Sequence, residues 1–142
     1  MLVSSKGILV LACGALWASP PVVTSSAGAL QPEQYRHYVE AFNRDDPEGR
    51  TNLIANVEAW DWMKQDIPFF ESSDKSIEEM YYFRWWEFRK HIRQTPAGFV
   101  ITEFLPDVPW AGAQNTVSAS AGHHFYEGRW LRDPEYLREY AR

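Results

Sequence analysis

One short segment of this sequence, residues 123–133 (HHFYEGRWLRD), holds many of the side chains that could do chemistry. His123 and Glu127 are four residues apart, so a helix would place both on one face. An imidazole beside a carboxylate can bind a metal ion or hydrogen-bond the hydroxyls of a polar ligand. The zinc motif with a glutamate between two helical histidines is absent, and the adjacent rings of His123 and His124 would point in different directions. We therefore expect no metal and no other cofactor. A polar ligand subsite and a histidine pair that completes a helix end both remain open.

Two carboxylates of this segment, Glu127 and Asp133, are candidates for acid/base chemistry. Glycoside hydrolysis uses two carboxyl groups about 5–10 Å apart across the scissile bond. Asp133 stands directly before Pro134, however, and is better explained as the N-cap of a helix. Glu103 and Asp107 are further acids that nothing in the sequence singles out. The sequence has no glycine-rich phosphate loop and no serine nucleophile motif, so the catalytic residues stay unidentified.

A second segment, residues 81–92 (YYFRWWEFRKHI), carries aromatic side chains on every face of a predicted helix. A helix that is apolar on all sides is buried on all sides. Arg84 interrupts the aromatic surface, and a buried arginine needs a partner. Glu87, three residues later, could supply it. The alternative is that Arg84 or Trp85 reaches a polar cavity.

Apolar periodicity predicts a mainly α-helical domain with one short strand and loop insertion near residues 99–115. Ser76 and Glu79 have the spacing of a capping box, which places a helix start at Ser76. Pro68 ends or kinks the helix before it. The predicted helices are residues 31–44, 51–67, 76–93, 116–127 and 133–142, and the predicted strand is residues 99–104.

Residues 1–29 are typical of a secretory signal. Lys6 precedes the apolar run of residues 8–18, and Ala27-Gly28-Ala29 follows as a cleavage site. The run is too short to span a membrane, which takes about 20 residues. We expect export to the periplasm or the extracellular space after cleavage near Ala29. A lipoprotein acylated at Cys13 is disfavoured because little apolar sequence precedes this cysteine, and a short buried N-terminal helix is the other alternative.

The remaining residues, 30–142, are acidic, lack cysteine and are rich in tryptophan. Without cysteine they can form no disulfide and no thiolate zinc site. Their negative net charge and the lack of a basic stripe exclude nucleic acid as an expected partner. A domain of this size cannot easily bury six tryptophans. Some of them, such as Trp110 in the proline-containing loop, would therefore face a ligand or further protein.

Three strings, YYFRWWEFRKHI, GFVITEFLPDVPWAG and NTVSASAGHHFYEGRWLRDPEYL, resemble in this order the N-terminal part of secreted bacterial glycoside hydrolases. The group in question is that of the mannosylglycerate hydrolases and glycoside hydrolase family 63. The resemblance runs from about residue 31 to the end of the chain. It implies the first helical hairpins of an (α/α)6 toroid, truncated at the C-terminus, with the rest of the catalytic domain as its partner.

The resemblance also implies a function. The full-length protein would hydrolyse glycosidic bonds in an oligo- or polysaccharide, and this chain alone, supplying one wall of the sugar cleft, would be inactive. The catalytic carboxylates would then lie beyond Arg142. A non-catalytic exported carbohydrate-binding or interaction module is the alternative. The candidate substrate-binding residues are Arg84, Trp110, His123, His124, Glu127, Arg129 and Trp130.

Overall fold

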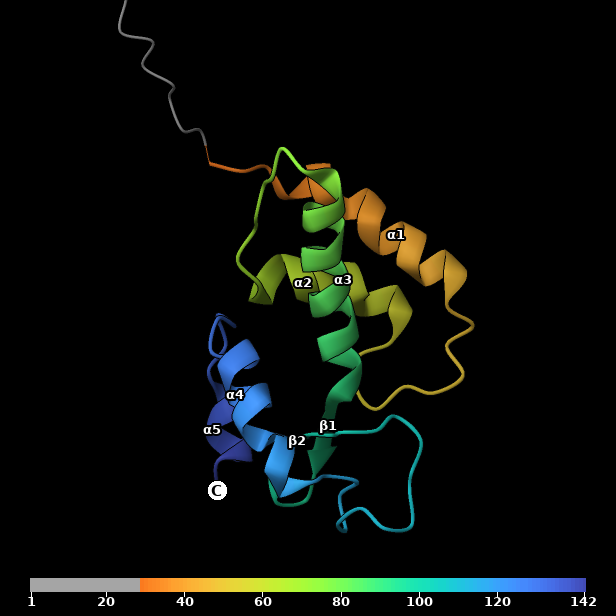
Figure 1. The fold of residues 1–142 in the computed structure, drawn as a ribbon, viewed down its shortest axis with the longest axis vertical. Helices are drawn as coiled ribbons and strands as arrows, with labels where there is room; N and C mark the ends of the chain where they lie inside the picture. The colour runs from red at the N-terminus through yellow and green to blue at the C-terminus, as the bar shows by residue number, and fades with distance from the viewer. Residues whose placement is uncertain (1–28) are drawn as a thin grey trace, which may run out of the picture.

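The longest helix, α3 (Lys75–His91), runs through the middle of the computed structural model, which describes residues 29–142 (Figure 1). The predicted secretory signal, with Cys13, lies outside the described residues except for Ala29. Within those residues no helix is both long and apolar enough to cross a membrane. The other elements are a 3-10 helix at Pro32–Tyr35, α1 (Arg36–Asp45), a 3-10 helix at Asn56–Glu58, α2 (Ala59–Asp66), β1 (Ile92–Thr95), β2 (Gly98–Ile101), a 3-10 helix at Ser118–Ser120, α4 (Ala121–Gly128) and α5 (Glu135–Tyr140). The prediction of a mainly helical fold is confirmed, whereas the toroid stays a prediction.

α3 begins at Lys75, one residue before its predicted start at Ser76, and its N-cap lies two residues earlier. Asp74, not Ser76, is the N-cap: its carboxylate accepts hydrogen bonds from the backbone N–H and the hydroxyl of Ser76. Aspartate is as good an N-cap as serine, and its negative charge also interacts favourably with the positive, N-terminal end of the helix dipole. The two preceding helices also differ from prediction, because residues 51–55 are not helical and the first helix opens as a 3-10 turn.

α3 does not continue to residue 93 as predicted but turns directly into a β-hairpin. β1 pairs with β2 in antiparallel register, from Ile92 opposite Ile101 to Thr95 opposite Gly98. Pro96 and Ala97 form the two-residue turn, and Gly98 has a φ of 123°, which side chains with a Cβ rarely tolerate. The predicted strand at 99–104 therefore exists only in its first half, and β1 is an element that the prediction missed.

The core forms where α3 packs against α1 and α2. Tyr82 of α3 stacks on Tyr35 and Tyr38, with ring centroids 4.9 and 5.4 Å apart. Four of the six tryptophans are buried, which leaves two exposed. The largest buried apolar side chains are Tyr35, Ile54, Trp60, Trp62, Met63, Ile67, Tyr82, Trp85, Trp86, Phe88, Ile92, Ile101 and Leu131.

Two buried cations of α3 hold the irregular segment 46–56 against this core. The guanidinium of Arg89, which has no exposed surface, donates to the Ile54 carbonyl oxygen at 2.6 Å. The Lys90 ammonium lies 2.6 Å from an Asp46 carboxylate oxygen and 4.1 Å from the centre of the Trp86 ring. A buried charge is tolerated only with such partners.

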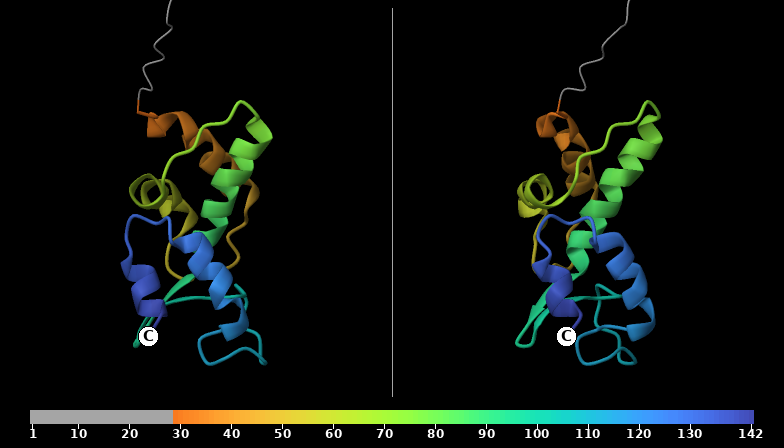
Figure 2. Two further views of the ribbon diagram at one scale, coloured as in Figure 1. Left: turned by 60° about the vertical axis from the view of Figure 1, so that its left-hand side comes forward. Right: turned by 90° about the vertical axis from the view of Figure 1, so that its left-hand side faces the viewer.

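α4 and α5 lie near the hairpin end of α3, and α1 lies beside its other half (Figure 2). α5 packs on β2, where Glu139 accepts a hydrogen bond from the Phe99 N–H at 2.8 Å. At the end of α4, a Cβ on Gly128 would come within 3.0 Å of Phe88 and Leu137. Only glycine lets α4 approach α3 and α5 this closely.

Replacing Asp46 by alanine will leave the Lys90 ammonium buried without its anion. We expect the free energy of unfolding to fall by about 3 kcal/mol, measured by urea unfolding of the chain. Asp45→Ala is the matched control, because the Asp45 side chain is 82% exposed. The control should change the free energy of unfolding by less than about 0.5 kcal/mol. Equal losses in the two variants would contradict this role for Asp46.

The Asp46 contribution should also depend on pH. Burial on its own would raise the pKa of Asp46, but hydrogen bonds from Lys90 and Asn56 outweigh it and hold the pKa below its ordinary value. A carboxylate whose pKa is lower in the folded state stabilises the fold at pH values above its ordinary pKa of about 3.9. This stabilisation is lost as the pH falls through the folded-state pKa. The stability difference between wild type and Asp46→Ala should therefore shrink on acidification below about pH 4.

Candidate functional site

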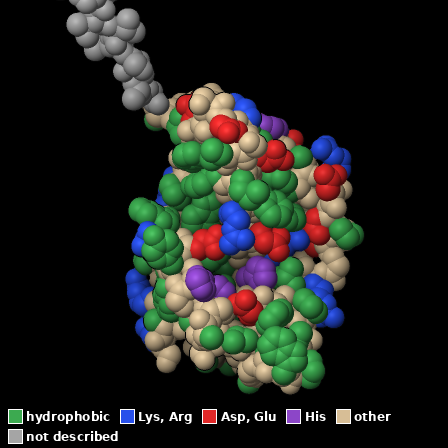
Figure 3. All heavy atoms as spheres, in the orientation of Figure 1, with side chains coloured by type: hydrophobic (Ala, Val, Ile, Leu, Met, Phe, Trp, Pro, Cys, Tyr) green, Lys and Arg blue, Asp and Glu red, His purple; other side chains and the backbone are tan. Residues whose placement is uncertain are grey.

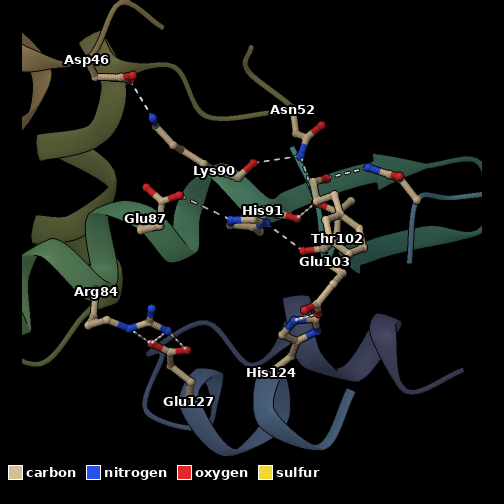
Figure 4. Close-up of polar contacts among 12 residues, drawn as sticks. Asp46, Asn52, Arg84, Glu87, Lys90, His91, Thr102, Glu103, His124 and Glu127 are labelled. Carbon is tan, nitrogen blue, oxygen red and sulfur yellow. Dashed lines mark hydrogen bonds and ion pairs between the residues drawn. The ribbon is translucent and has the colours of Figure 1, made fainter. Parts of the chain in front are cut away.

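A polar pocket of about 150 Å³ lies between the C-terminal half of α3, the end of β2 and α4 (Figure 4). In Figure 3, histidine, acidic and basic side chains form a band across this face of the molecule, between hydrophobic surfaces above and below. Three separate chain segments supply the polar side chains that line the pocket, so only the folded chain can assemble it. The polar side chains that line the pocket are Arg84, Glu87, His91, Thr102, Glu103, His124 and Glu127.

His91, the last residue of α3, is fixed by the hairpin that follows it. Its Nδ1 lies 2.8 Å from the Thr102 carbonyl oxygen. Because a carbonyl can only accept, Nδ1 carries the hydrogen, and Nε2 faces Glu87 at 3.6 Å. The neighbouring His91 ring lowers the pKa of Glu87, against the opposing effect of burial. Glu87 therefore offers an ionised carboxylate to the pocket.

His124 of α4 lies across the pocket from His91, between a carboxylate and a phenol. Its Nε2 is 3.4 Å from a Glu103 oxygen, and its Nδ1 is 3.0 Å from the Tyr140 hydroxyl. Burial lowers the pKa of His124, and the nearby Glu103 acts in the opposite direction. Burial also raises the pKa of Tyr140, so this hydroxyl keeps its proton. In the neutral form of His124, Tyr140 donates to Nδ1, and the Nε2–H points to Glu103.

Arg84 and Glu127 form the edge of the pocket. The Arg84 guanidinium donates to both Glu127 oxygens, with N–O distances of 2.8 to 3.1 Å. The predicted pairing of Arg84 with Glu87 is therefore wrong, because Glu87 points to His91. The actual partner is on α4, 43 residues away, which no local spacing reveals. The alternative is confirmed: Arg84 lines the polar pocket.

An aromatic groove of about 740 Å³ opens on the other side of this ion pair. Arg84 and Glu127 line both cavities. Trp130 and Tyr126 are 59% and 67% exposed, so both rings offer free surface to a ligand. The Arg129 guanidinium stacks 3.9 Å from the centre of the Tyr126 ring and 4.9 Å from that of Trp130. The remaining lining residues are Phe70, Ile77, Met80, Tyr81, Trp85 and His123.

A comparison with known proteins supports a glycoside-hydrolase-like protein. A solved structure named sialidase matches this chain with 44% sequence identity and a TM-score of 0.77. The match covers 79% of this chain and 10% of the sialidase, so this chain spans about a tenth of the length of the protein it resembles. No protein-family model and no curated protein matches the chain.

The structure brings most of the predicted substrate-binding residues together. Arg84, Glu127 and the histidines line the two cavities, where His123 faces the groove and His124 faces the polar pocket. Arg129 lines neither cavity but stacks on the two exposed rings of the groove. The adjacent histidines thus point into different cavities, as their spacing predicted.

Trp110 lies elsewhere, on the loop that follows β2. It is 67% exposed and packs edge-on against Phe104, with centroids 4.9 Å apart. Asn115 holds this loop, accepting from the Val108 N–H and donating to the carbonyl oxygens of Phe104 and Pro106. Trp110 is not among the residues that line the groove or the polar pocket.

The two candidate acids, Glu127 and Asp133, line different cavities. Asp133 caps the chain before α5 by accepting from the Glu135 N–H at 2.9 Å, close to its predicted role. It lies with Asp66 in a separate acidic groove. The fold therefore does not place Glu127 and Asp133 across one cavity. In the described part of the chain, no group of three or more histidine, cysteine or acidic side chains is arranged to hold a metal ion.

Sequence reasoning missed three residues of the pocket: Glu87 as the partner of His91, His91 itself, and Glu103 as the partner of His124. His91 and Glu87 are four residues apart, an i, i+4 spacing that could have paired them. Nothing local relates Glu103 to His124, which meet only because α4 packs across the end of the hairpin.

Neutral His124 should make the stability of the chain depend on pH near neutrality. Because the folded-state pKa of His124 lies below its ordinary value of about 6.5, its neutral ring makes its whole contribution to folding stability above pH 6.5. This contribution is lost as the pH falls from 6.5 toward the folded-state pKa. We expect His124→Gln to remove this decline, measured as the difference in unfolding free energy between pH 7.5 and 5.5. His123→Gln, at the neighbouring exposed position, should keep it. A titration of the His124 ring above pH 6.5 in NMR spectra would contradict the prediction.

Proposed function

We propose that this chain forms one wall of the sugar-binding cleft of an exported glycoside hydrolase, which cleaves glycosidic bonds in an oligo- or polysaccharide. The observation that carries the proposal is the junction of the aromatic groove with the polar pocket at Arg84 and Glu127. The similarity to a protein named sialidase, over a tenth of its length, supports the same reaction class.

The two cavities suit the two kinds of surface that a sugar presents. A pyranose ring has C–H faces, which pack on aromatic rings, and an edge of hydroxyls, which need hydrogen-bond partners. Trp130 and Tyr126 offer exposed rings in the groove. The adjoining pocket offers carboxylate oxygens and imidazole nitrogens, which can accept and donate to hydroxyls. A groove of 740 Å³ also lies within the size range of small-molecule sites, which are mostly apolar with a few polar groups.

In this proposal Glu127 binds and orients the sugar rather than transferring a proton. Both its oxygens already accept hydrogen bonds from Arg84. The fork of Arg84 fixes the carboxylate at the mouth of both cavities, and its remaining lone pairs can accept from ligand hydroxyls. The catalytic acid and base are proposed to come from parts of the toroid beyond Arg142, consistent with the resemblance of the sequence.

The first test uses Trp130 in the protein encoded by the whole reading frame that contains this chain. We expect this protein to hydrolyse members of a panel of aryl glycosides, and Trp130→Ala to weaken sugar binding about tenfold, the loss expected for one aromatic stacking contact. Trp110→Ala is the matched control and should leave binding unchanged, because Trp110 lies outside both cavities. Binding without hydrolysis would indicate the non-catalytic carbohydrate module instead. If the protein neither bound nor hydrolysed any of these sugars, the proposal would be overturned.

The second test uses Glu127→Gln in the same protein. Loss of the carboxylate charge weakens the Arg84 fork and should lower kcat/KM about tenfold. The melting temperature should change little, because the Arg84 side chain is 56% exposed and exposed ion pairs stabilise folds only weakly. Glu135→Gln, which breaks the surface pair with Arg138 on α5, should change neither quantity. Unfolding of Glu127→Gln, with unchanged kinetics of the soluble remainder, would assign Glu127 a structural role.

A further inference from the structure

We infer that the polar pocket takes an uncharged, hydroxyl-bearing part of a sugar and rejects a carboxylate at the same place. The inference rests on the proposed function, since it names the class of sugar that this wall of the cleft selects. It follows from the charges that face the pocket and from the partner that each nearby lysine or arginine already has.

The lining of the pocket is acidic. Glu87, Glu103 and Glu127 face it, whereas Arg84 is the one lysine or arginine among its lining residues. Whether His91 is protonated or neutral, the negative charges outnumber the positive ones, since burial favours the neutral form of His124.

The one lining guanidinium is already engaged. Both Glu127 oxygens accept from Arg84, with the closest N–O distance at 2.8 Å. A ligand carboxylate at this fork would have to displace Glu127, and one that approached the Nη1 side of the guanidinium would lie beside the Glu127 carboxylate. Either way, the ligand would add a negative charge beside the carboxylates of the pocket, and their repulsion would oppose binding.

The other cations near the site are engaged as well. Lys90 is paired with Asp46 at 2.6 Å, on the far side of α3 from α4 (Figure 4). Arg93 is paired with Asp107 at 3.1 Å. Arg129 stacks on Tyr126 and lines neither cavity. Among the described residues that line the pocket, no lysine or arginine lacks an anionic partner.

Hydroxyls suit the same lining. Ionised carboxylates only accept hydrogen bonds, and a sugar hydroxyl donates one while its oxygen still accepts another. The Glu103 and Glu127 side chains are 34% and 28% exposed, so solvent reaches them but they are partly withdrawn from it. Salt screens such partly buried charges less than fully exposed ones, which sharpens the discrimination between a hydroxyl and a carboxylate.

The test measures binding to pairs of sugars that differ by one charge. The probes are methyl glucoside with methyl glucuronide and methyl galactoside with methyl galacturonide, titrated calorimetrically into the protein encoded by the whole reading frame. In each pair that binds, the neutral sugar should bind about tenfold tighter or more, since like charges placed together are strongly unfavourable. Acidic sugars that bind equally well or better would overturn the inference and leave the proposed function standing. Failure of every sugar to bind would overturn the proposed function itself, and the inference with it.

Variants assign the preference to this pocket. Glu103→Gln keeps the size and a hydrogen-bond acceptor but removes one charge, and Glu87→Gln does the same beside His91. Each should narrow the ratio of neutral to acidic affinity at least about threefold, because one of the repelling charges is gone. Glu40→Gln, which removes an exposed carboxylate of α1, should leave the ratio unchanged. An unchanged ratio in both pocket variants, with both folded by circular dichroism, would also overturn the inference.

Discussion

The constraint on which this fold depends is a helix, α3, that carries large aromatic side chains all around its axis. Such a helix is stable in water only if protein or ligand covers most of its surface. α1 and α2 pack on one side, where Tyr82 and Trp86 lie against Tyr38 and Phe42 of α1. On the side that faces α4, the cover is incomplete, and Met80 is 57% exposed beside the aromatic groove. The groove is thus the part of an all-round aromatic helix that the described residues do not cover.

The same helix explains why polar chemistry gathers at one of its ends. Arg89 and Lys90 point toward the 46–56 segment, where Arg89 donates to a backbone carbonyl and Lys90 pairs with a carboxylate. Arg84, Glu87 and His91 line the polar pocket that faces α4. The helix therefore separates a structural set of charges from a set that is open to ligands. Both sets lie within eight residues of sequence, and nothing in their types alone distinguishes them.

Sequence reasoning succeeded where a local rule decides the outcome. The helical periodicity of α3, the exposure of Trp110 and the divergence of His123 from His124 all follow from spacing along one element. It failed where two elements meet. β1 was missed because Arg93 and Gln94 do not alternate with apolar residues as a half-buried strand does, and its pairing with β2 alone makes it a strand. Arg84 was assigned to Glu87 because the nearest acid in the sequence looked sufficient, whereas the tertiary fold offered Glu127.

The position of α5 ties the site to the fold in a further way. Tyr140 of α5 donates to His124 of α4, which in turn faces Glu103 just beyond β2. The orientation and tautomer of His124 therefore depend on α5 packing against β2, which the Glu139 carboxylate reinforces through the Phe99 N–H. A shift of α5 along the strand would withdraw the hydroxyl from Nδ1 and leave a buried, unpaired ring nitrogen. Docking of the last helix thus fixes the orientation of His124 in the polar pocket.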